Sequence, residues 1–164
     1  MSTIQWVILL VALQRLGELW LSARNVRWQI DQGGREIGRA HYPLIVLVHA
    51  GWMLSMLFAI PDSAPLSMPL IAAFLVLQAG RVWVITSLGR YWSTRIISNP
   101  SAPLIRRGPY RWIRHPNYLI VALEIAVLPL AFGAWRIALI FSLANAVVLW
   151  WRIRIENTAL DERF

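Results

Sequence analysis

The sequence predicts an all-α membrane protein, a polytopic helical bundle of about five transmembrane helices that forms a single domain over residues 1–164. Two observations lead to this fold class. Hydrophobic residues make up 58% of the chain and charged residues 15%, whereas soluble globular domains contain about 45–50% and about 25%. The apolar residues also gather in long uninterrupted segments, and a membrane-spanning helix needs about 20 of them.

Five segments are predicted as membrane helices: residues 4–21, 44–60, 66–88, 118–132 and 134–151. Four of them approach the length that crosses about 30 Å of hydrocarbon. The fourth is shorter, contains Pro129 and is separated from the fifth by Gly133 alone, so we predict a tight helical hairpin with a kink at the proline. The first segment is expected to be a retained helix, because its flanks do not match those of a secretory signal.

The placement of the basic residues predicts the orientation. The net charge is +8, and all 16 basic residues are arginine. Thirteen of them lie in three polar stretches, residues 22–43, 89–117 and 152–164. Since positive loops stay on the cytoplasmic side, we expect a multi-pass cell-membrane protein with its N-terminus outside and its C-terminus in the cytoplasm. A soluble nucleic-acid binder would not be this apolar, so no nucleic acid is expected as a partner.

The stretch best suited to hold a ligand is residues 90–118, which contains six arginines, His115 and four prolines. At its end, in R-H-P-N-Y, Pro116 can begin a helix and so place His115 at the helix N-terminus. Free N–H groups there favour an anionic group, and Arg114 adds a permanent positive charge. This segment is either a carboxylate or phosphate site, or a cap whose arginines contact anionic lipid headgroups.

The polar residues after the last span allow two interpretations. Arg152 and Glu156 are four residues apart and therefore share a helix face. They form an exposed ion pair, or else Glu156 turns toward the arginine-rich loop, where its carboxylate binds an ammonium group or ribose hydroxyls.

Ionisable residues inside the predicted spans are also informative, because charge is costly in lipid and usually faces the bundle interior. Arg15 and Glu18 are predicted to pair on the first span. Glu124 either pairs with Arg81 and locks the bundle, or takes part in a reaction. The chain has no cysteine, and its three histidines lack the spacing of metal ligands, so no metal site is predicted.

The ten tryptophans have a simple explanation, since several fall near predicted span ends, where aromatic belts form. Trp92 and Trp112 lie in the arginine-rich loop as well. Either indole could stack on an adenine ring or cover a cofactor.

Two motifs resemble the isoprenylcysteine carboxyl methyltransferase family. They are R-R-G-P-Y-R-W-I-R-H-P-N-Y and, after the apolar hairpin, R-I-R-I-E-N-T-A-L, and the part of the chain that carries them is residues 89–164. The matching positions are Gly108, Tyr110, Arg114, His115, Pro116 and Tyr118 in the first motif and Arg152, Ile153, Glu156, Asn157 and Leu160 in the second. The family pattern has a second glutamate where this chain has Asn157, which keeps hydrogen bonding but loses a charge.

The resemblance implies an integral-membrane enzyme that uses S-adenosyl-L-methionine, bound in a cytoplasmic pocket between the loop before the fourth helix and the C-terminal turn. The implied cofactor-binding residues are Tyr110, His115, Pro116, Tyr118, Glu156 and Asn157. The expected function is O-methylation of a lipophilic acceptor at a carboxyl or similar group. The expected partners are this lipophilic or lipid-tailed acceptor and the membrane lipids; no obligate protein partner is expected.

The expected catalytic residues are Arg114, Glu124 and Arg152. An ionised carboxylate acceptor needs only alignment, which either arginine can give, whereas a phenol or enol needs a base, and Glu124 and His115 are the candidates. Three alternatives remain open at this stage. They are an O-methyltransferase for alkylresorcinol or alkylpyrone polyketide lipids, a phospholipid N-methyltransferase, and a non-enzymatic membrane scaffold.

Overall fold

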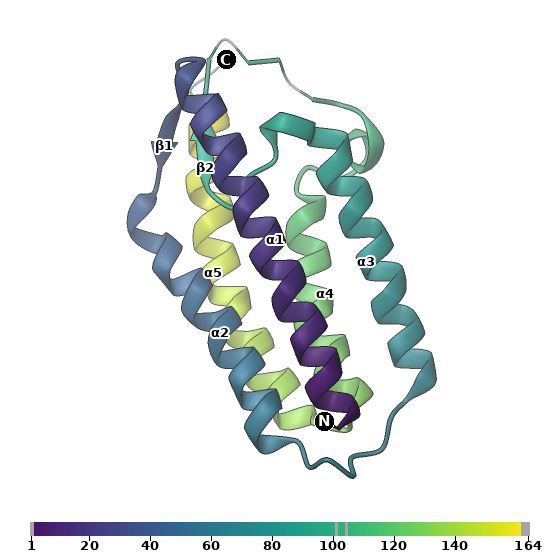
Figure 1. Cartoon of the computed structure of the whole chain (residues 1–164). Helices are drawn as coiled ribbons and strands as arrows, with labels where there is room; N and C mark the ends of the chain where they lie inside the picture. Colours follow the sequence, from purple (N-terminus) through teal and green to yellow (C-terminus); the bar gives the residue numbers. More distant parts are fainter. Residues whose placement is uncertain (1, 101, 104, 162–164) are drawn as a thin grey trace.

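The structure is a computed structural model that describes residues 2–100, 102–103 and 105–161, and the side chains as far as residue 158. The described residues form five α-helices, with the bounds α1 Thr3–Asp31, α2 Tyr42–Ala59, α3 Met68–Leu88, α4 Pro116–Ala131 and α5 Trp135–Asp161. The helices run side by side in an elongated bundle (Figure 1). This confirms the predicted helical bundle. Arg163, one of the arginines counted for orientation, lies outside the described residues.

Each predicted span corresponds to one helix. The helices α1, α2, α3 and α5 are long and apolar enough to cross a membrane. With 16 residues, α4 is shorter, about 24 Å at 1.5 Å per residue. The predicted hairpin is present, because Gly133 adopts a φ of +71° between α4 and α5 and its N–H donates to the carbonyl of Leu130 at 2.9 Å.

Both α1 and α5 continue about ten residues beyond the predicted spans. A span predicted from hydropathy stops at the last apolar residue. The helix itself can continue further where its polar side chains have hydrogen-bond partners. On the extension of α1, the buried Asn25 donates through Nδ2 to the carbonyls of Trp92 at 2.8 Å and Gly89 at 3.2 Å. These bonds tie α1 to the connection that follows α3.

A two-stranded antiparallel ribbon, β1 Arg35–Ile37 and β2 Ile96–Ser98, was not predicted. Strands of three residues are too short to show an alternating pattern. The ribbon links the α1–α2 connection to the α3–α4 connection at the end of the bundle where α5 finishes (Figure 1). Three short 3-10 helices lie in the same connections: η1 Arg39–His41, η2 Gly89–Tyr91 and η3 Gly108–Arg111.

The opposite end of the bundle holds the main apolar core, which includes Trp52, Met56, Ile125 and Leu128, each at most 1% exposed. The Trp52 indole donates to the carbonyl of Ile125 at 3.1 Å. That carbonyl lacks its usual partner in α4, because Pro129 has no N–H. The proline falls in the last turn of α4, and the indole satisfies the group that it leaves free.

A charged cluster joins α1, α3 and α4 near their middles. Glu124 is fully buried and accepts hydrogen bonds from Arg81 Nε at 2.9 Å and Arg15 Nη2 at 2.6 Å. Glu18 completes the cluster through Arg15 Nη1 at 2.8 Å and Arg81 Nη1 at 3.2 Å. The predicted Arg15–Glu18 pair and the Glu124–Arg81 pair are therefore both present, as parts of one network.

Candidate functional site

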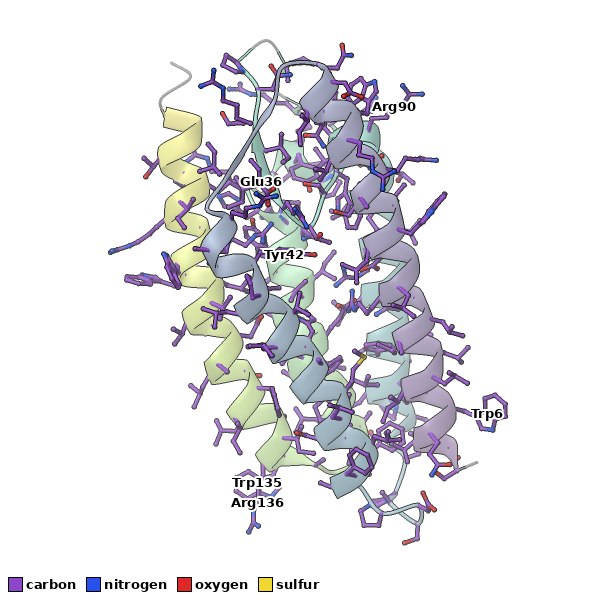
Figure 2. The ribbon with its side chains drawn as sticks, turned by 60° about the vertical axis from the view of Figure 1, so that its left-hand side comes forward. Trp6, Glu36, Tyr42, Arg90, Trp135 and Arg136 are labelled. Carbon is purple, nitrogen blue, oxygen red and sulfur yellow. The ribbon has the colours of Figure 1, made fainter. Side chains whose placement is uncertain are left out.

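A polar cavity lies at the arginine-rich end of the bundle, among the connections and the adjoining helix ends. Its lining residues come from α1, α3, the segment between α3 and α4, the first turn of α4 and the C-terminal part of α5. They are Gln29, Leu88, Tyr91, Trp92, Ser93, Arg95, Ile96, Ile97, Ser98, Tyr110, Arg114, His115, Asn117, Tyr118, Arg152 and Glu156. Figure 2 shows this end of the molecule, with Arg90 and Glu36 labelled, far from Trp135 and Arg136 at the other end.

The 3-10 helix η3 forms one side of the cavity and is held closely against α3. Gly108 adopts a φ of +58°, and a Cβ atom there would lie 2.1 Å from the Ser87 hydroxyl oxygen, so only glycine fits. Arg107 Nε donates to the Ser87 carbonyl at 2.7 Å. This packing places Tyr110 in the cavity wall, where burial and the negative charge of Glu156 raise the pKa of its hydroxyl. Tyr110 therefore remains a protonated donor at neutral pH.

The R-H-P-N-Y segment begins α4 as predicted, with Pro116 at the first helical position and His115 as the capping residue. The His115 ring stacks on the Tyr118 ring, with centroids 5.3 Å apart and planes 18° from parallel. Its Nε2 atom is hydrogen-bonded to Asn157 Oδ1 at 3.1 Å. Asn157, where the chain departs from the family pattern, thus fixes the orientation of the histidine.

Glu156 turns toward the arginine-rich loop, which is the second of the two predicted interpretations. Between Arg152 and Glu156 lies the hydroxyl of Tyr118, which donates to Glu156 Oε2 and accepts from Arg152 Nε, the latter at 2.7 Å. Arg152 is only 5% exposed, and its Nη2 donates to the Thr94 carbonyl at 2.7 Å. The end of α5 is therefore bound to both the start of α4 and the segment before β2.

Most of the predicted site residues come together here. Those that line the polar cavity are Tyr110, Arg114, His115, Tyr118, Arg152 and Glu156. Pro116 is buried behind them, and Asn157 reaches the site through His115. Glu124 is not brought to this group: it lies in the charged cluster and lines neither this cavity nor the neighbouring one.

A second, largely apolar cavity lies beside the first, within the bundle. It is bounded mainly by α1, α2, α4 and α5, and its lining residues are Arg15, Glu18, Leu19, Tyr42, Ile45, Val46, His49, Ala50, Met53, Arg81, Trp92, Thr94, Asn117, Tyr118, Val121, Asn145, Leu149 and Arg152. Four side chains belong to both cavities, namely Trp92, Asn117, Tyr118 and Arg152. We call these four the shared wall.

Two members of the shared wall were missed or misread from the sequence. Trp92 matched the pattern of an aromatic belt, yet it is 2% exposed. Asn117 carries no pattern of its own, because its neighbours Pro116 and Tyr118 supply the whole motif. The Trp92 indole nitrogen and the Asn117 Oδ1 atom are buried and have no hydrogen-bond partner among the described residues. Trp112, the other indole considered for a cofactor, is 70% exposed.

Both motifs lie in a part of the chain that matches a known protein family. The model of the isoprenylcysteine carboxyl methyltransferase (ICMT) family matches residues 70–162, which include α4, α5 and both motifs. The chain belongs to the isoprenylcysteine carboxyl methyltransferase family. It is also 37% identical over 162 residues to the uncharacterized protein YpbQ of Bacillus subtilis (strain 168), covering 96% of each chain. No solved structure matches.

Membership of the isoprenylcysteine carboxyl methyltransferase family, together with four helices that are long and apolar enough to span a bilayer, indicates a multi-pass membrane methyltransferase. The family match extends over both motifs, whereas the similarity to the Bacillus protein extends over nearly the whole chain, α1 and α2 included.

Proposed function

We propose that the protein transfers a methyl group from S-adenosylmethionine to an oxygen atom of a lipophilic acceptor. The observation that carries the proposal is the pair of adjoining cavities, one polar and one apolar, whose shared wall contains the family-motif residues Tyr118 and Arg152. A methyl transfer needs its two reactants in contact and in line. Two chemically different cavities that share four lining side chains support the proposal that the two reactants meet there.

The residues of the polar cavity fit S-adenosylmethionine, which carries an ammonium group, a carboxylate, ribose hydroxyls and an adenine ring. Glu156 can bind the ammonium group or the ribose, and Arg114 can bind the carboxylate. Tyr91, Tyr110 and Trp92 offer aromatic surfaces for the adenine. The indole N–H of Trp92, buried without a partner among the described residues, is a further donor for a bound molecule.

When bound, S-adenosylmethionine supplies an electrophilic methyl group on a sulfonium sulfur. The protein positions the two reactants and keeps water away from them. Arg152 is held by Tyr118 and the Thr94 carbonyl, so its guanidinium keeps one orientation on the shared wall and can align the acceptor. Trp92, in the same wall, is buried and adds apolar surface that disfavours water there.

The apolar cavity fits the tail of an acceptor that is dissolved in the membrane. Its walls on α2 include Ile45, Val46 and Met53, and those on α4 and α5 include Val121 and Leu149. Because lipid tails are as apolar as these side chains, a hydrocarbon chain can pass from the bilayer into the cavity at little cost in free energy. We therefore expect a lipid-tailed acceptor whose polar end reaches Tyr118 and Arg152.

The proposal also assigns the polar cavity to the cytoplasmic side. The arginine-rich connections that surround it are expected on that side by the positive-inside rule, and the cell makes S-adenosylmethionine in the cytoplasm. Trp135 and Arg136, at the opposite end (Figure 2), would then lie outside.

The test is binding and transfer with the purified protein in lipid nanodiscs. His115→Ala and Glu156→Ala should each weaken the binding of S-adenosylhomocysteine by about tenfold or more, the cost of losing a hydrogen bond to a charged group. Asp62→Asn, a change at an exposed loop residue, is the matched control. Unchanged affinity in both site variants would remove the assignment.

Label from methyl-labelled S-adenosylmethionine should appear in an O-methylated lipid. Label in phosphatidylethanolamine would instead identify a phospholipid N-methyltransferase. A wild-type protein that binds neither S-adenosylmethionine nor S-adenosylhomocysteine would be a membrane scaffold.

A further inference from the structure

Two polar side chains of the apolar cavity carry hydrogen-bonding groups that no described residue uses. One is Asn145 on α5, which is 3% exposed and lines this cavity. No hydrogen bond joins its amide to another described residue. An unpaired polar group costs free energy in apolar surroundings, and most buried side-chain polar groups have a partner. The Asn145 amide is therefore available to a molecule in the cavity.

His49 on α2 is the second of these side chains. Its Nδ1 atom lies 2.8 Å from the carbonyl oxygen of Ile45, and because a carbonyl can only accept, Nδ1 carries the proton. In a neutral imidazole the other nitrogen, Nε2, is then an acceptor. Within the described part of the chain nothing donates to it. Since His49 lines the same cavity, its Nε2 atom is also available there.

These two side chains lie at nearly the same depth, because α2 and α5 run side by side in opposite directions. Just before α2, the ring of His41 is 6.0 Å from the ring of Trp151 on α5. Ten residues later along α2 and ten earlier along α5, a Cβ atom at Gly51 would lie 3.3 Å from the Phe141 ring. At 1.5 Å per residue, this register brings the two polar side chains within about 3 Å of one level.

Their level is separated from the shared wall by two turns of helix. Asn145 precedes Arg152 by seven residues on α5, which is about 10 Å along the axis. Seven residues are almost two whole turns, so both side chains lie on one side of α5, and both line the apolar cavity. We call Asn145 and His49 the deep pair.

The charged side chains that line this cavity from α1 and α3 are already paired. Arg15, Glu18 and Arg81 belong to the neutral charged cluster, with N–O distances of 2.8 and 3.2 Å to Glu18. An ionic ligand group at this depth would be buried without a free counter-charge, which is costly. The deep pair therefore suits a neutral group. A hydroxyl fits both members, because it can donate to His49 Nε2 and accept from Asn145 Nδ2.

We propose that the deep pair binds a hydroxyl group on the tail of the methyl acceptor, about 10 Å from the oxygen that receives the methyl group. This inference rests on the proposed function and names a feature of the acceptor that the shared wall does not determine. Between the two levels the cavity is lined by apolar side chains such as Val46 and Leu149, which fit the intervening hydrocarbon. The cavity would then distinguish its acceptor from the plain hydrocarbon tails of the bilayer.

The first experiment measures the binding of tail-hydroxylated lipids to the protein loaded with S-adenosylhomocysteine in lipid nanodiscs. Two series, alkylphenols and fatty acids, carry one hydroxyl at successive tail carbons, and each compound competes with a fluorescent lipid. We expect affinity in at least one series to peak at one position, about tenfold above that of the plain tail, as two hydrogen bonds in a buried site can provide. Equal affinity at every position, or a plain tail that binds best, would overturn the inference.

The second experiment assigns this peak to the deep pair. Asn145→Leu and His49→Leu should each abolish the peak and leave binding of the plain tail at least as tight. The matched control is Ser142→Ala, which removes a hydroxyl from α5 at a residue that lines neither cavity. Because the Asn145 amide has no partner among the described residues, Asn145→Leu should not lower the unfolding midpoint in micelles. A lower midpoint with an unchanged peak would make Asn145 a structural residue and contradict the proposal.

The outcomes separate this inference from the proposed function. If no hydroxyl position improves binding while S-adenosylhomocysteine still binds, the assignment of the deep pair is wrong and the methyltransferase proposal stands. If the wild-type protein does not bind S-adenosylhomocysteine, the proposed function fails, and the lipid series is measured without it. A peak that Asn145→Leu and His49→Leu abolish would then still identify the deep pair as a site for a lipid hydroxyl.

Discussion

The carboxylate of Glu124 receives hydrogen bonds from side chains of two other helices. Arg15 on α1 donates at 2.6 Å, and Gln78 and Arg81 on α3 donate at 2.8 and 2.9 Å. Two arginines and two glutamates make the cluster neutral overall, which is the arrangement that permits charge inside a bundle. With its oxygens occupied in this way, we interpret Glu124 as a structural residue rather than a base.

Glu124→Gln should therefore act on stability. Removing one partner of a buried ion pair leaves uncompensated charge, and we expect a loss of about 3–5 kcal/mol in the free energy of unfolding. Denaturant unfolding in detergent micelles measures it, with Asp62→Asn as a control that should change stability by about 0.5 kcal/mol or less. Folded Glu124→Gln protein should still bind S-adenosylhomocysteine. Full stability combined with lost methyl transfer would instead make Glu124 a reaction residue.

Individual residues also show where sequence reasoning reaches its limit. The spacing of Arg15 and Glu18 was enough to predict their pair, because both lie on one helix. The hydrogen bonds to Glu124 depend on how three helices pack, and the spacing of residues along the sequence does not reveal that packing. Trp92 was ambiguous for a related reason: a tryptophan just after an apolar span looks the same whether its ring faces lipid or, as here, two cavities.

At the scale of helices, a side chain of α2 completes the backbone hydrogen bonding of α4. Pro129 leaves the carbonyl of Ile125 without its helical N–H, and Trp52 donates to it at 3.1 Å. Trp52 is fully buried in the main core, so without this indole the carbonyl would have neither water nor a helical partner.

A double-mutant cycle tests this dependence. Trp52→Phe should destabilise the protein by about 1–3 kcal/mol, the cost of leaving a buried polar group unpaired. In a Pro129→Ala background the new alanine N–H can bond the Ile125 carbonyl, so the same substitution should cost about 1 kcal/mol less. Unfolding midpoints in micelles provide the four values. An equal cost in both backgrounds would contradict the proposed role of the indole.

The helices themselves were largely predictable, whereas their polar ends were not. Apolar composition located all five helices because lipid imposes that composition on a spanning segment. The extensions of α1 and α5 carry residues such as Asn25 and Arg152, whose partners are distant in sequence. The β1–β2 ribbon was unpredictable for the same reason. Its three-residue strands exist because they pair with each other, and neither strand carries a pattern in its own sequence. These unpredicted parts supply a share of the polar cavity wall, including Gln29, Ile96 and Ile97.

For the whole molecule, the motif resemblance predicted most of the candidate site in advance. From the sequence alone, it predicted that the start of α4 and the C-terminal part of α5 form one site. What it left out is the contribution of the first half of the chain, including Gln29 in the polar cavity and the α2 residues of the apolar one. Those residues all lie before residues 70–162, the region that the family model matches.

The orientation is a further prediction at this scale. Because the chain has no cysteine, single cysteines can be introduced and labelled with a membrane-impermeant maleimide. Ser63→Cys, between α2 and α3, should react in intact cells. Arg35→Cys and Thr158→Cys should react only after the membrane is opened, since the arginine-rich end is expected in the cytoplasm. The reverse pattern would place the polar cavity outside.

The β1–β2 ribbon also affects the order in which parts of the chain can fold during synthesis. The ribosome makes β1 first, and about 60 further residues must follow before β2 exists, which takes about 3 to 12 s at about 5–20 residues per second. For most of this interval β1 lacks its partner strand, and Asn25 at the polar end of α1 lacks the carbonyls of Gly89 and Trp92. The connection between α1 and α2 therefore gains its strand pairing only after β2 has been made, and we expect it to be more open to proteases until then.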